Sequence, residues 1–597
     1  QKKHFQAHAF YLLIYINRSN MIWFIEKVDD LVDEPCELQL KQNSAAMAAN
    51  EEKEAEKDPY AYLDRDGFTS EKYKIEVRGL PKYYGIGEFK KFLNEKLDLQ
   101  SCKVKPPKRS SEWLYVSFRS EEGRQKAIET LNGFLWKNCK LSAQVFLYSD
   151  KVKSTTIPLW NMHYPSQLKQ NEMKSILTNI CREMFKESKG DLLEWLKYQK
   201  DKHKGLPCEL LPILSASTIT GYRNKCEFTV GKGTKGDKVV IGFRLSSYAA
   251  GSTAVGPIDD LCHIPSKMKT VAKFMQNSGL KPFQPVDHSG YWRQVTVRTS
   301  LCDDLMVIVA IHPQDLSSER LEELKSHLKD FFETGKGAEV RVTSLYFQLM
   351  NKNFVGSDPF FHIGGTKYIE ETLLGMKFRV SPQAFFQVNT LGAEVLYKAA
   401  IDLAKPTADT ALLDICCGTG AIGLAFSKHC GEVFGLEMIE DAIKDARENV
   451  VANKVENCEF FVGKAEDILS PVIRRTTKPD IIAVVDPPRA GLHQRALLTL
   501  RKARRLSRLV YVSCDPRAAA RNLVDFARPP SKQYIGDPLV PVKAVAVDMF
   551  PHTKHCELVL CLERLSVVMK ARESESEAAQ FPSEANRTYL LGESRRS

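Results

Sequence analysis

Three residues in the last third of the chain have types and spacing that suit covalent chemistry. Asp486 and Cys514 each end an apolar run typical of a strand, and Glu557 enters a later run of the same kind. Ligands of open α/β sheets bind at the carboxyl ends of strands, so Asp486 and Cys514 fall where a substrate would lie. A lone cysteine at a strand end is more often a small buried hydrophobe. The two acids beside it favour a nucleophile here.

Methylation of uracil at C5 requires a nucleophile, a base and a group that holds the edge of the ring. Uracil C5 is a poor nucleophile, but addition of a thiolate to C6 makes an enolate whose C5 is electron-rich. The C5 proton must then leave so that the thiolate can be expelled. Cys514, Glu557 and Asp486 would supply the nucleophile, the base and the edge contact. The thiolate is the reactive form, and His552 and His555 are candidates for favouring its ionisation.

A glycine-rich turn further upstream is a candidate cofactor site. The run from Asp414 to Gly423 leaves a buried strand and enters a helix, and Gly418 within it lets the backbone pass close to a ligand. Glu437, at the end of the next strand, can accept hydrogen bonds from both ribose hydroxyls of NAD or of S-adenosylmethionine. Asp414 favours S-adenosylmethionine, because a carboxylate before the loop would repel a pyrophosphate but attract sulfonium and ammonium groups.

Over about residues 205–565, these segments resemble the RNA uracil-5-methyltransferases, which act on uridine C5 of tRNA and rRNA. The segments that carry the resemblance are Ser381–Asn389, the glycine loop, the Asp-Pro-Pro-Arg run at Asp486, the Ser-Cys-Asp-Pro run at Cys514 and the His-Cys-Glu run at Glu557. The resemblance implies S-adenosylmethionine as cofactor, with Gln387, Glu437 and Asp486 at the cofactor or in its neighbourhood. It also implies Cys514 as nucleophile and Glu557 as base.

The same resemblance implies tRNA as the partner, with the T-loop uridine at position 54 of cytosolic tRNA as the target and some mRNA as a further partner. The rRNA enzymes of the family carry a four-cysteine iron–sulfur cluster. The 15 cysteines of this chain include no C-x-x-C pair and no matching cluster, so we expect neither an iron–sulfur cluster nor another metal. Such cysteine usage indicates a reducing compartment, and we expect the cytosol, with nuclear entry open.

Three other functions use parts of the same pattern. RNA cytosine-C5 methyltransferases also add a cysteine to C6, but they typically carry a Pro-Cys motif after the aspartate strand, where this chain has Asp486-Pro487-Pro488. An NAD-dependent oxidoreductase has no evident use for Cys514 paired with Glu557. A non-catalytic RNA chaperone on the same fold would need neither residue.

The elements that must position these residues predict an α/β fold of the Rossmann-like class I methyltransferase kind. Apolar strands alternate with helices over residues 371–565, which implies a parallel sheet covered on both faces. Residues 206–370 read as a mainly β central domain, and residues 149–205 as a charged, solvated helical connector. Residues 1–72 are expected to be a largely disordered leader and residues 566–597 a disordered tail.

Residues 73–148 have the βαβ–βαβ order of an RNA-recognition motif. The strand Ser111–Phe118 carries Trp113 and Tyr115 at the two positions where bases would stack, while Glu76 stands where a further aromatic is usual. With 15 basic and 8 acidic residues, this segment has a net charge of +7. We therefore expect an RNA-binding module with Trp113 and Tyr115 as its RNA contacts.

The composition of the whole chain agrees with several domains and a polyanionic partner. A length of 597 residues exceeds what one core supports, and the net charge is +11. Hydrophobic residues make up 43% of the chain and charged residues 27%, as in ordinary globular proteins. No run reaches the roughly 18–20 apolar residues that a membrane helix needs, so no membrane partner is expected.

Overall fold

The computed structural model describes residues 13–17, 20–24, 73–81, 84–106, 112–145, 165–233, 238–245, 253–276, 281–284, 289–314, 316–350 and 360–580. Most of the predicted leader lies outside these residues, as do positions 581–597 of the predicted tail. The leader contributes one antiparallel pair of strands, β1 (Leu13–Asn17) and β2 (Asn20–Phe24).

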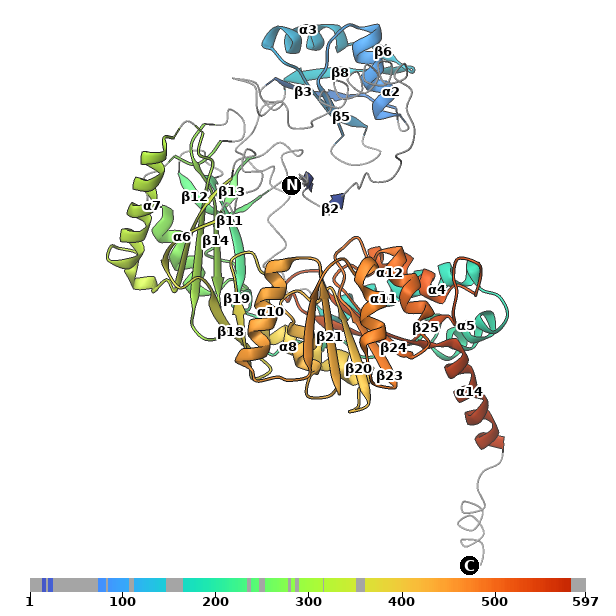
Figure 1. The fold of residues 1–597 in the computed structure, drawn as a ribbon. Helices are drawn as coiled ribbons and strands as arrows, with labels where there is room; N and C mark the ends of the chain where they lie inside the picture. The colour runs from blue at the N-terminus through green and yellow to red at the C-terminus, as the bar shows by residue number, and fades with distance from the viewer. Residues whose placement is uncertain are drawn as a thin grey trace, which may run out of the picture.

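The first compact unit, drawn in blue in Figure 1, is a four-stranded antiparallel sheet in the order β4-β5-β3-β8. Alternate residues such as Ile75 and Val77 point to one face, where the helices cover them. Helix α3 begins after Ser120, whose hydroxyl accepts a hydrogen bond from the Gly123 N–H. The elements are β3 (Lys74–Arg78), α2 (Ile86–Lys91), the π-helix η2 (Phe92–Lys96), β4 (Lys103–Lys105), β5 (Trp113–Ser117), α3 (Glu121–Leu131), β6 (Leu135–Trp136), β7 (Cys139–Lys140) and β8 (Ser142–Val145).

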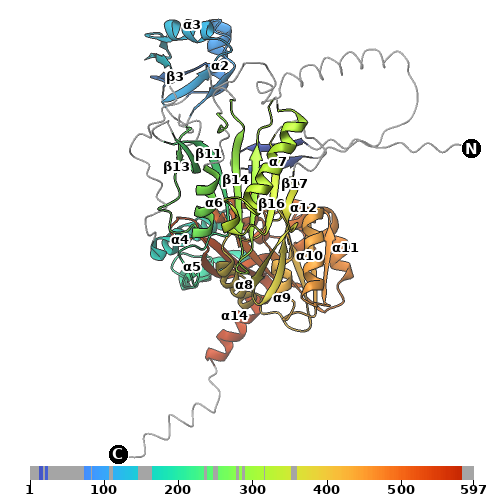
Figure 2. The ribbon, with the colours of Figure 1, turned by 90° about the vertical axis from the view of Figure 1, so that its left-hand side faces the viewer.

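The central unit is a seven-stranded sheet, as the predicted mainly β character implies, in the order β13-β12-β11-β14-β15-β16-β17. Two helices pack on one face of this sheet (Figure 2). A separate hairpin, β18–β19, leads from it to the next unit. The elements are β11 (Lys225–Lys232), β12 (Val239–Arg244), β13 (Val255–Gly256), α6 (Ser266–Gln276), β14 (Trp292–Thr299), β15 (Leu305–Ile311), α7 (Ser318–Glu333), the 3-10 helix η5 (Ala338–Val340), β16 (Ser344–Leu349), β17 (Phe360–Gly365), β18 (Ile369–Leu373) and β19 (Met376–Val380).

The last unit is a nine-stranded, mostly parallel sheet in the order β10-β25-β26-β24-β23-β20-β21-β22, with β9 also paired to β25. Strand β26 runs antiparallel to both of its neighbours. Strands β9 (Glu209–Leu210) and β10 (Leu214–Ser215) come from the segment that we expected to begin the central β domain. The other strands are β20 (Thr410–Ile415), β21 (Glu432–Glu437), β22 (Cys458–Val462), β23 (Asp480–Val485), β24 (Leu506–Ser513), β25 (Leu539–Asp548) and β26 (Glu557–Arg564).

Helices cover both faces of this sheet, which explains why its strands are apolar runs without alternation. Helices α8 (Thr390–Ala404) and α9 (Ala421–Phe426) pack on one face, and α10 (Glu440–Ala452) lies against β21, β22 and β19. Helices α11 (Ala465–Arg475), α12 (Gln494–Lys502) and α13 (Pro516–Ala527) cover the opposite face. The predicted α/β architecture, a mostly parallel sheet covered on both faces, is therefore confirmed for this unit.

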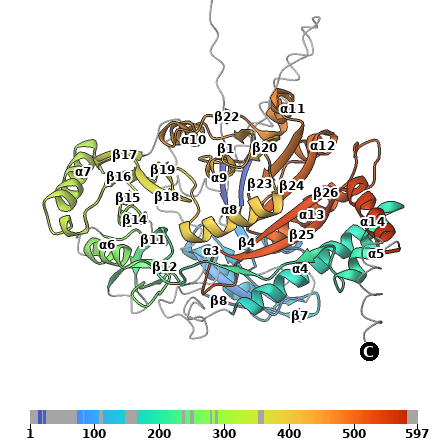
Figure 3. The same cartoon turned by 90° about the horizontal axis from the view of Figure 1, so that it is seen from below.

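The segment before the central unit corrects one expectation. Helices α4 (Ser166–Glu187) and α5 (Asp191–Lys202) are charged and helical, as predicted, but they are no solvated connector. Their apolar stripe, including Leu177 and Leu196, is fully buried in the core of the last unit. Ion pairs to α13 and its C-cap reinforce the packing, and Figure 3 shows α4 alongside β25 and α13. A stripe of this width on a charged helix needs a partner surface, which the solvated interpretation did not supply.

The predicted disordered tail is also partly wrong. The chain continues directly from β26 into helix α14, Leu565–Gln580, which packs against α5 through its first turns. The side chain of Arg572 lies over the ring of Tyr198, with 4.6 Å between the guanidinium carbon and the ring centroid. No helix among the described residues is long and apolar enough to cross a membrane.

Candidate active site

The register of the last sheet places the predicted nucleophile across from the predicted base. In the antiparallel pair β24–β26, Ser513 faces Leu558, so Cys514, one residue past the end of β24, comes next to Glu557, the first residue of β26. The charge of Glu557 acts on the Cys514 thiol, which agrees with this placement. Strand β23 lies on the other side of β24 and ends immediately before Asp486. The structure therefore brings Asp486, Cys514 and Glu557 to one edge of the sheet, as predicted.

Cys514 is exposed, and its thiol is held protonated by its surroundings. The pKa of Cys514 is raised to about 11, first because the protein around it removes solvent and then because Glu557 and Asp486 are acidic. Arg489 opposes this shift, since its guanidinium donates a hydrogen bond to the sulfur and places a positive charge beside it. The sequence alone offers His552 and His555 for this role. Arg489 is the group that favours the thiolate, and it stands in the run after Asp486.

The predicted base has a raised affinity for protons. Glu557 is buried at the first position of β26, and its Oε2 has no hydrogen-bond partner among the described residues. Burial, followed by the charge of Asp486, raises the pKa of Glu557 to about 8. Burial raises the pKa of Asp486 to about 7. A carboxylate with such a pKa is a stronger base than an ordinary glutamate.

A residue that the sequence did not single out also borders this group of acids. Tyr397 lies on the buried face of α8, and burial raises its pKa well above the usual value. The charges of Asp486, Asp414 and Glu557 push the pKa of Tyr397 in the same direction, so its phenol is close to all three carboxylates. From the sequence, Tyr397 looks like any aromatic residue on a core-facing helix.

The glycine loop between β20 and α9 has the backbone geometry that the sequence predicted. Asp414 is completely buried, and its Oδ2 accepts a hydrogen bond from the Gly423 N–H at 2.8 Å. Its Oδ1 has no hydrogen-bond partner among the described residues, and burial raises the pKa of Asp414 to about 7. Gly420 has φ +79°, and a Cβ there would lie 2.7 Å from the Phe460 ring. Only glycine therefore fits at that position.

Glu437 is the last residue of β21, and its carboxylate accepts a hydrogen bond from the glycine loop. One carboxylate oxygen accepts a hydrogen bond from the Gly418 N–H at 3.2 Å, and the other accepts one from the Ile439 N–H at 3.0 Å. Gly418 has φ +54° and open space where a Cβ would stand. The half-buried carboxylate thus faces the loop that a cofactor would contact.

The predicted Gln387 lies in a segment that a helix holds in place. Residues Ser381 to Asn389 run from β19 to α8, and Asn389 caps α8 by accepting a hydrogen bond from the Gly392 N–H. Gln387 is buried, and its carbonyl accepts a hydrogen bond from the Asn224 side chain of the central unit. Phe385 in the same segment is 65% exposed, an unusual fraction for a phenylalanine, and the sequence alone did not distinguish it.

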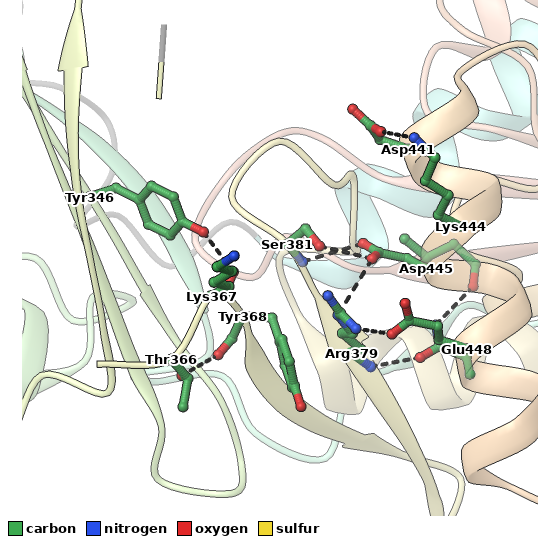
Figure 4. Close-up of polar contacts among 12 residues, drawn as sticks. Tyr346, Thr366, Lys367, Tyr368, Arg379, Ser381, Asp441, Lys444, Asp445 and Glu448 are labelled. Atoms are coloured by element: carbon green, nitrogen blue, oxygen red, sulfur yellow. Dashed lines mark hydrogen bonds and ion pairs between the residues drawn. The ribbon is translucent and has the colours of Figure 1, made fainter. Parts of the chain in front are cut away.

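Three polar side chains at intervals of four, two on α10 and one at its C-cap, form what we call the α10 ladder with the edge strand β19. Asn449 accepts a hydrogen bond from the Arg379 N–H and donates one to the Thr419 carbonyl of the glycine loop. The other contacts are Asp445 with the N–H and hydroxyl of Ser381, and Asn453 with the N–H and carbonyl of Lys377. Figure 4 shows Asp445 and Ser381 facing each other, with Arg379 between Asp445 and Glu448.

The ladder forms because the spacing of residues along the helix matches the spacing along the strand. Four residues of an α-helix rise about 6.0 Å, and two residues of a strand rise about 6.6 Å. Side chains of one helical stripe therefore meet every second residue of the strand. Asp445 holds Ser381, the first residue of the Ser381–Asn389 segment, and Asn449 holds the glycine loop, so one helix positions both.

The predicted RNA contacts lie in the first unit. Trp113 and Tyr115 stand on the same face of β5 with ring centroids 5.0 Å apart, edge to face. Trp113 is half-buried beside Arg78, while Tyr115 is buried beneath the ammonium group of Lys74. Within the described part of the chain, no group of three or more His, Cys, Asp or Glu side chains could hold a metal ion.

Comparison with known proteins shows which family the chain resembles. Residues 362–565 match the family described as tRNA (Uracil-5-)-methyltransferase. The chain is 40% identical over 537 residues to mouse (Mus musculus) tRNA (uracil-5-)-methyltransferase homolog A, which covers 85% of this chain and 86% of that protein. It is 39% identical over 431 residues to the mouse homolog B, covering 70% of this chain and 86% of that protein.

Among solved structures, the chain is similar to the tRNA (uracil-54, C5)-methyltransferase of Pyrococcus abyssi in complex with S-adenosyl-L-homocysteine. The identity is 24%, the TM-score is 0.45, and the similarity covers 62% of this chain and 82% of that one. The residues matched to the family include the glycine loop and the three residues at the sheet edge.

Proposed function

Because this chain belongs to the tRNA (uracil-5-)-methyltransferase family, it is an enzyme that depends on S-adenosylmethionine, and we propose that it methylates C5 of the T-loop uridine at position 54 of cytosolic tRNA. Some mRNA is a further proposed substrate, and the cytosol, with nuclear entry, is the proposed location. The observation that carries the chemistry is the register that sets Cys514 opposite Glu557.

The residues around the glycine loop fit the cofactor. Asp414 keeps one buried oxygen without a partner among the described residues, which suits a positively charged ligand. We propose that Asp414, Gly418, Glu437 and Gln387 hold S-adenosylmethionine or line its site, with Glu437 toward the ribose. The bound cofactor supplies an electrophilic methyl group.

Cys514 begins the proposed reaction. Its thiol loses a proton to solvent, and Arg489 stabilises the thiolate. The sulfur then forms a bond to C6 of the uridine, and the electrons of the C5–C6 double bond pass toward the ring carbonyl at C4. The ring, held at its edge by Asp486, becomes nucleophilic at C5 and can take the methyl group.

Glu557 completes the proposed reaction. Its carboxylate removes the proton from C5, and the electrons of that C–H bond restore the C5–C6 double bond. The C6–sulfur bond breaks, and the thiolate of Cys514 is regenerated. Burial places Glu557 away from bulk water, which keeps its proton affinity high enough for this step, because its pKa is raised to about 8.

The experiment that tests the function uses tRNA containing 5-fluorouridine. Fluorine cannot leave C5 as a proton does, so methylation should stop at a protein–RNA adduct that survives a denaturing gel. Cys514→Ala should form no adduct. Cys556→Ala is the matched control, because Cys556 is buried and its thiol bonds the Val547 carbonyl, so the adduct should persist. An adduct that survives Cys514→Ala would overturn the assignment.

We also propose that residues 73–148 bind RNA. Trp113, half-buried beside Arg78, offers a ring for stacking, and the buried Tyr115 supports it edge-on. This module would raise the affinity for tRNA without taking part in the chemistry. Residues 206–370, without β9 and β10, then form the central domain. Residues 371–565 form the catalytic domain together with α4, α5, β9 and β10.

A further inference from the structure

The turn between β25 and β26 presents two basic residues at the edge of the sheet that carries the nucleophile. Lys554 and His555 are exposed and precede Glu557, which faces Cys514 across the sheet. Arg489, also exposed, bonds the Cys514 sulfur and lies close enough to influence His555. Arg489 therefore borders the nucleophile, and Lys554 and His555 lie on the turn that leads into Glu557.

Two of the acids near this turn already have partners. Asp548 is paired with the buried Lys169, and Glu172 is paired with Arg517. Among the described residues, neither Arg489 nor Lys554 forms an ion pair. Exposed cations that form no ion pair within the protein can pair with a bound anion.

The turn is also held rigidly. Lys169 on α4 donates hydrogen bonds to Asp548 and to the Phe550 carbonyl, and its side chain is completely buried. Tyr222 from the central unit donates a hydrogen bond to the Pro551 carbonyl at 2.9 Å. A site whose backbone is fixed before binding loses less entropy when its ligand arrives.

Resting on the proposed function, we infer that Lys554 and His555 form a subsite for a phosphodiester group of the RNA strand next to the target uridine. A uridine that reacts with Cys514 must leave its stack, and its backbone must then pass over the rim of the site. Contacts to phosphate fix the position of a strand without reading its sequence. Lys554 supplies charge, and the half-exposed ring of His555 supplies an N–H donor.

The test measures how methylation of tRNA depends on salt. Lys554→Gln should raise KM for tRNA several-fold at about 0.15 M salt and leave kcat unchanged. The slope of log(kcat/KM) against log[salt] should become shallower by about 0.7–1, the value of one phosphate contact. Lys554→Arg should restore both quantities. Lys502→Gln is the matched control, since Lys502 ends α12 at the opposite edge of the sheet.

Three outcomes would overturn the subsite. The first is a salt slope that Lys554→Gln does not change. The second is an equal loss in the Lys502 variant, which would mean a general effect of surface charge. The third is a weakened affinity for S-adenosylhomocysteine, which would assign the basic pair to the cofactor carboxylate. In each case an intact adduct with 5-fluorouridine tRNA shows that the proposed function still holds, whereas loss of the adduct would mean that the function itself has failed.

Discussion

At the scale of single residues, Cys514 and Glu557 should fail at different steps. Glu557→Gln keeps the nucleophile, so the C6 bond and methyl transfer can still occur, but the C5 proton stays and elimination stalls. Methylated tRNA should accumulate as a covalent complex through Cys514. A denaturing gel with tRNA labelled by the transferred methyl group measures the amount of covalent complex. Cys514→Ala is the negative control, because it cannot form the complex. If Glu557→Gln released free methylated tRNA at the wild-type rate, Glu557 would not be the base that removes the C5 proton.

Arg489 should set the pH at which the nucleophile becomes active. The pKa of Cys514 is raised to about 11 even with the guanidinium present, so the rate of adduct formation should rise with pH through the neutral range. Arg489→Gln removes the group that lowers this pKa, so the rising limb of the pH profile should move to higher pH. If the thiol pKa rises by about one, the rate at pH 7 should fall roughly tenfold.

The rate of adduct formation with 5-fluorouridine tRNA, followed from about pH 6 to about pH 10, measures the displacement of the profile around the usual thiol range. Arg489→Lys should retain part of the charge effect. Arg495→Gln serves as control, because Arg495 is exposed on α12 and paired with Asp467. A profile for Arg489→Gln that is lower at every pH but not displaced would show that Arg489 only binds RNA.

At the scale of elements, the α10 ladder allows a paired test. Asn449→Ala leaves the half-buried Arg379 N–H without its partner and releases the glycine loop at Thr419, so affinity for S-adenosylhomocysteine should fall by about 1–3 kcal/mol. Asn453→Ala removes an equal number of atoms from the same ladder. In the strand, the Asn453 side chain contacts only Lys377, on the exposed side. Its cofactor affinity should stay unchanged.

Calorimetric titration of both variants measures the difference, and circular dichroism checks that each is folded. Equal losses would mean that the ladder supports the fold as a whole and has no special link to the cofactor loop.

The sequence predicted the elements around the site well, since local patterns encode them. The glycine loop, the strand ends at Asp486 and Cys514, and the entry at Glu557 all stand where they were expected. The sequence could not predict what depends on distant pairing. The register that opposes Cys514 to Glu557, and the contact of Arg489 with the thiol, arise only when separate strands meet.

At the scale of the whole molecule, two truncations should separate binding from folding. Removing residues 1–164 deletes the first unit and leaves α4 and α5 in place, so kcat should stay near its full value while KM for tRNA rises. Removing residues 1–205 also deletes both helices and uncovers their apolar partner surface, together with Asp548. That protein should be poorly soluble or lack a cooperative melting transition. Full solubility and activity would show that the helices are dispensable.

Strands β9 and β10 pair with β25 only after the chain has built the whole central unit and most of the catalytic one. Glu209 lies beside Lys543, so about 330 residues separate the partners. At roughly 5–20 residues per second, a ribosome needs roughly 15 to 70 seconds to synthesise that stretch. During this interval the apolar stripe of α4 and α5 has no surface to cover it. Chaperones should therefore bind the nascent chain longest at α4 and α5. This binding should continue well after the first unit has left the ribosome.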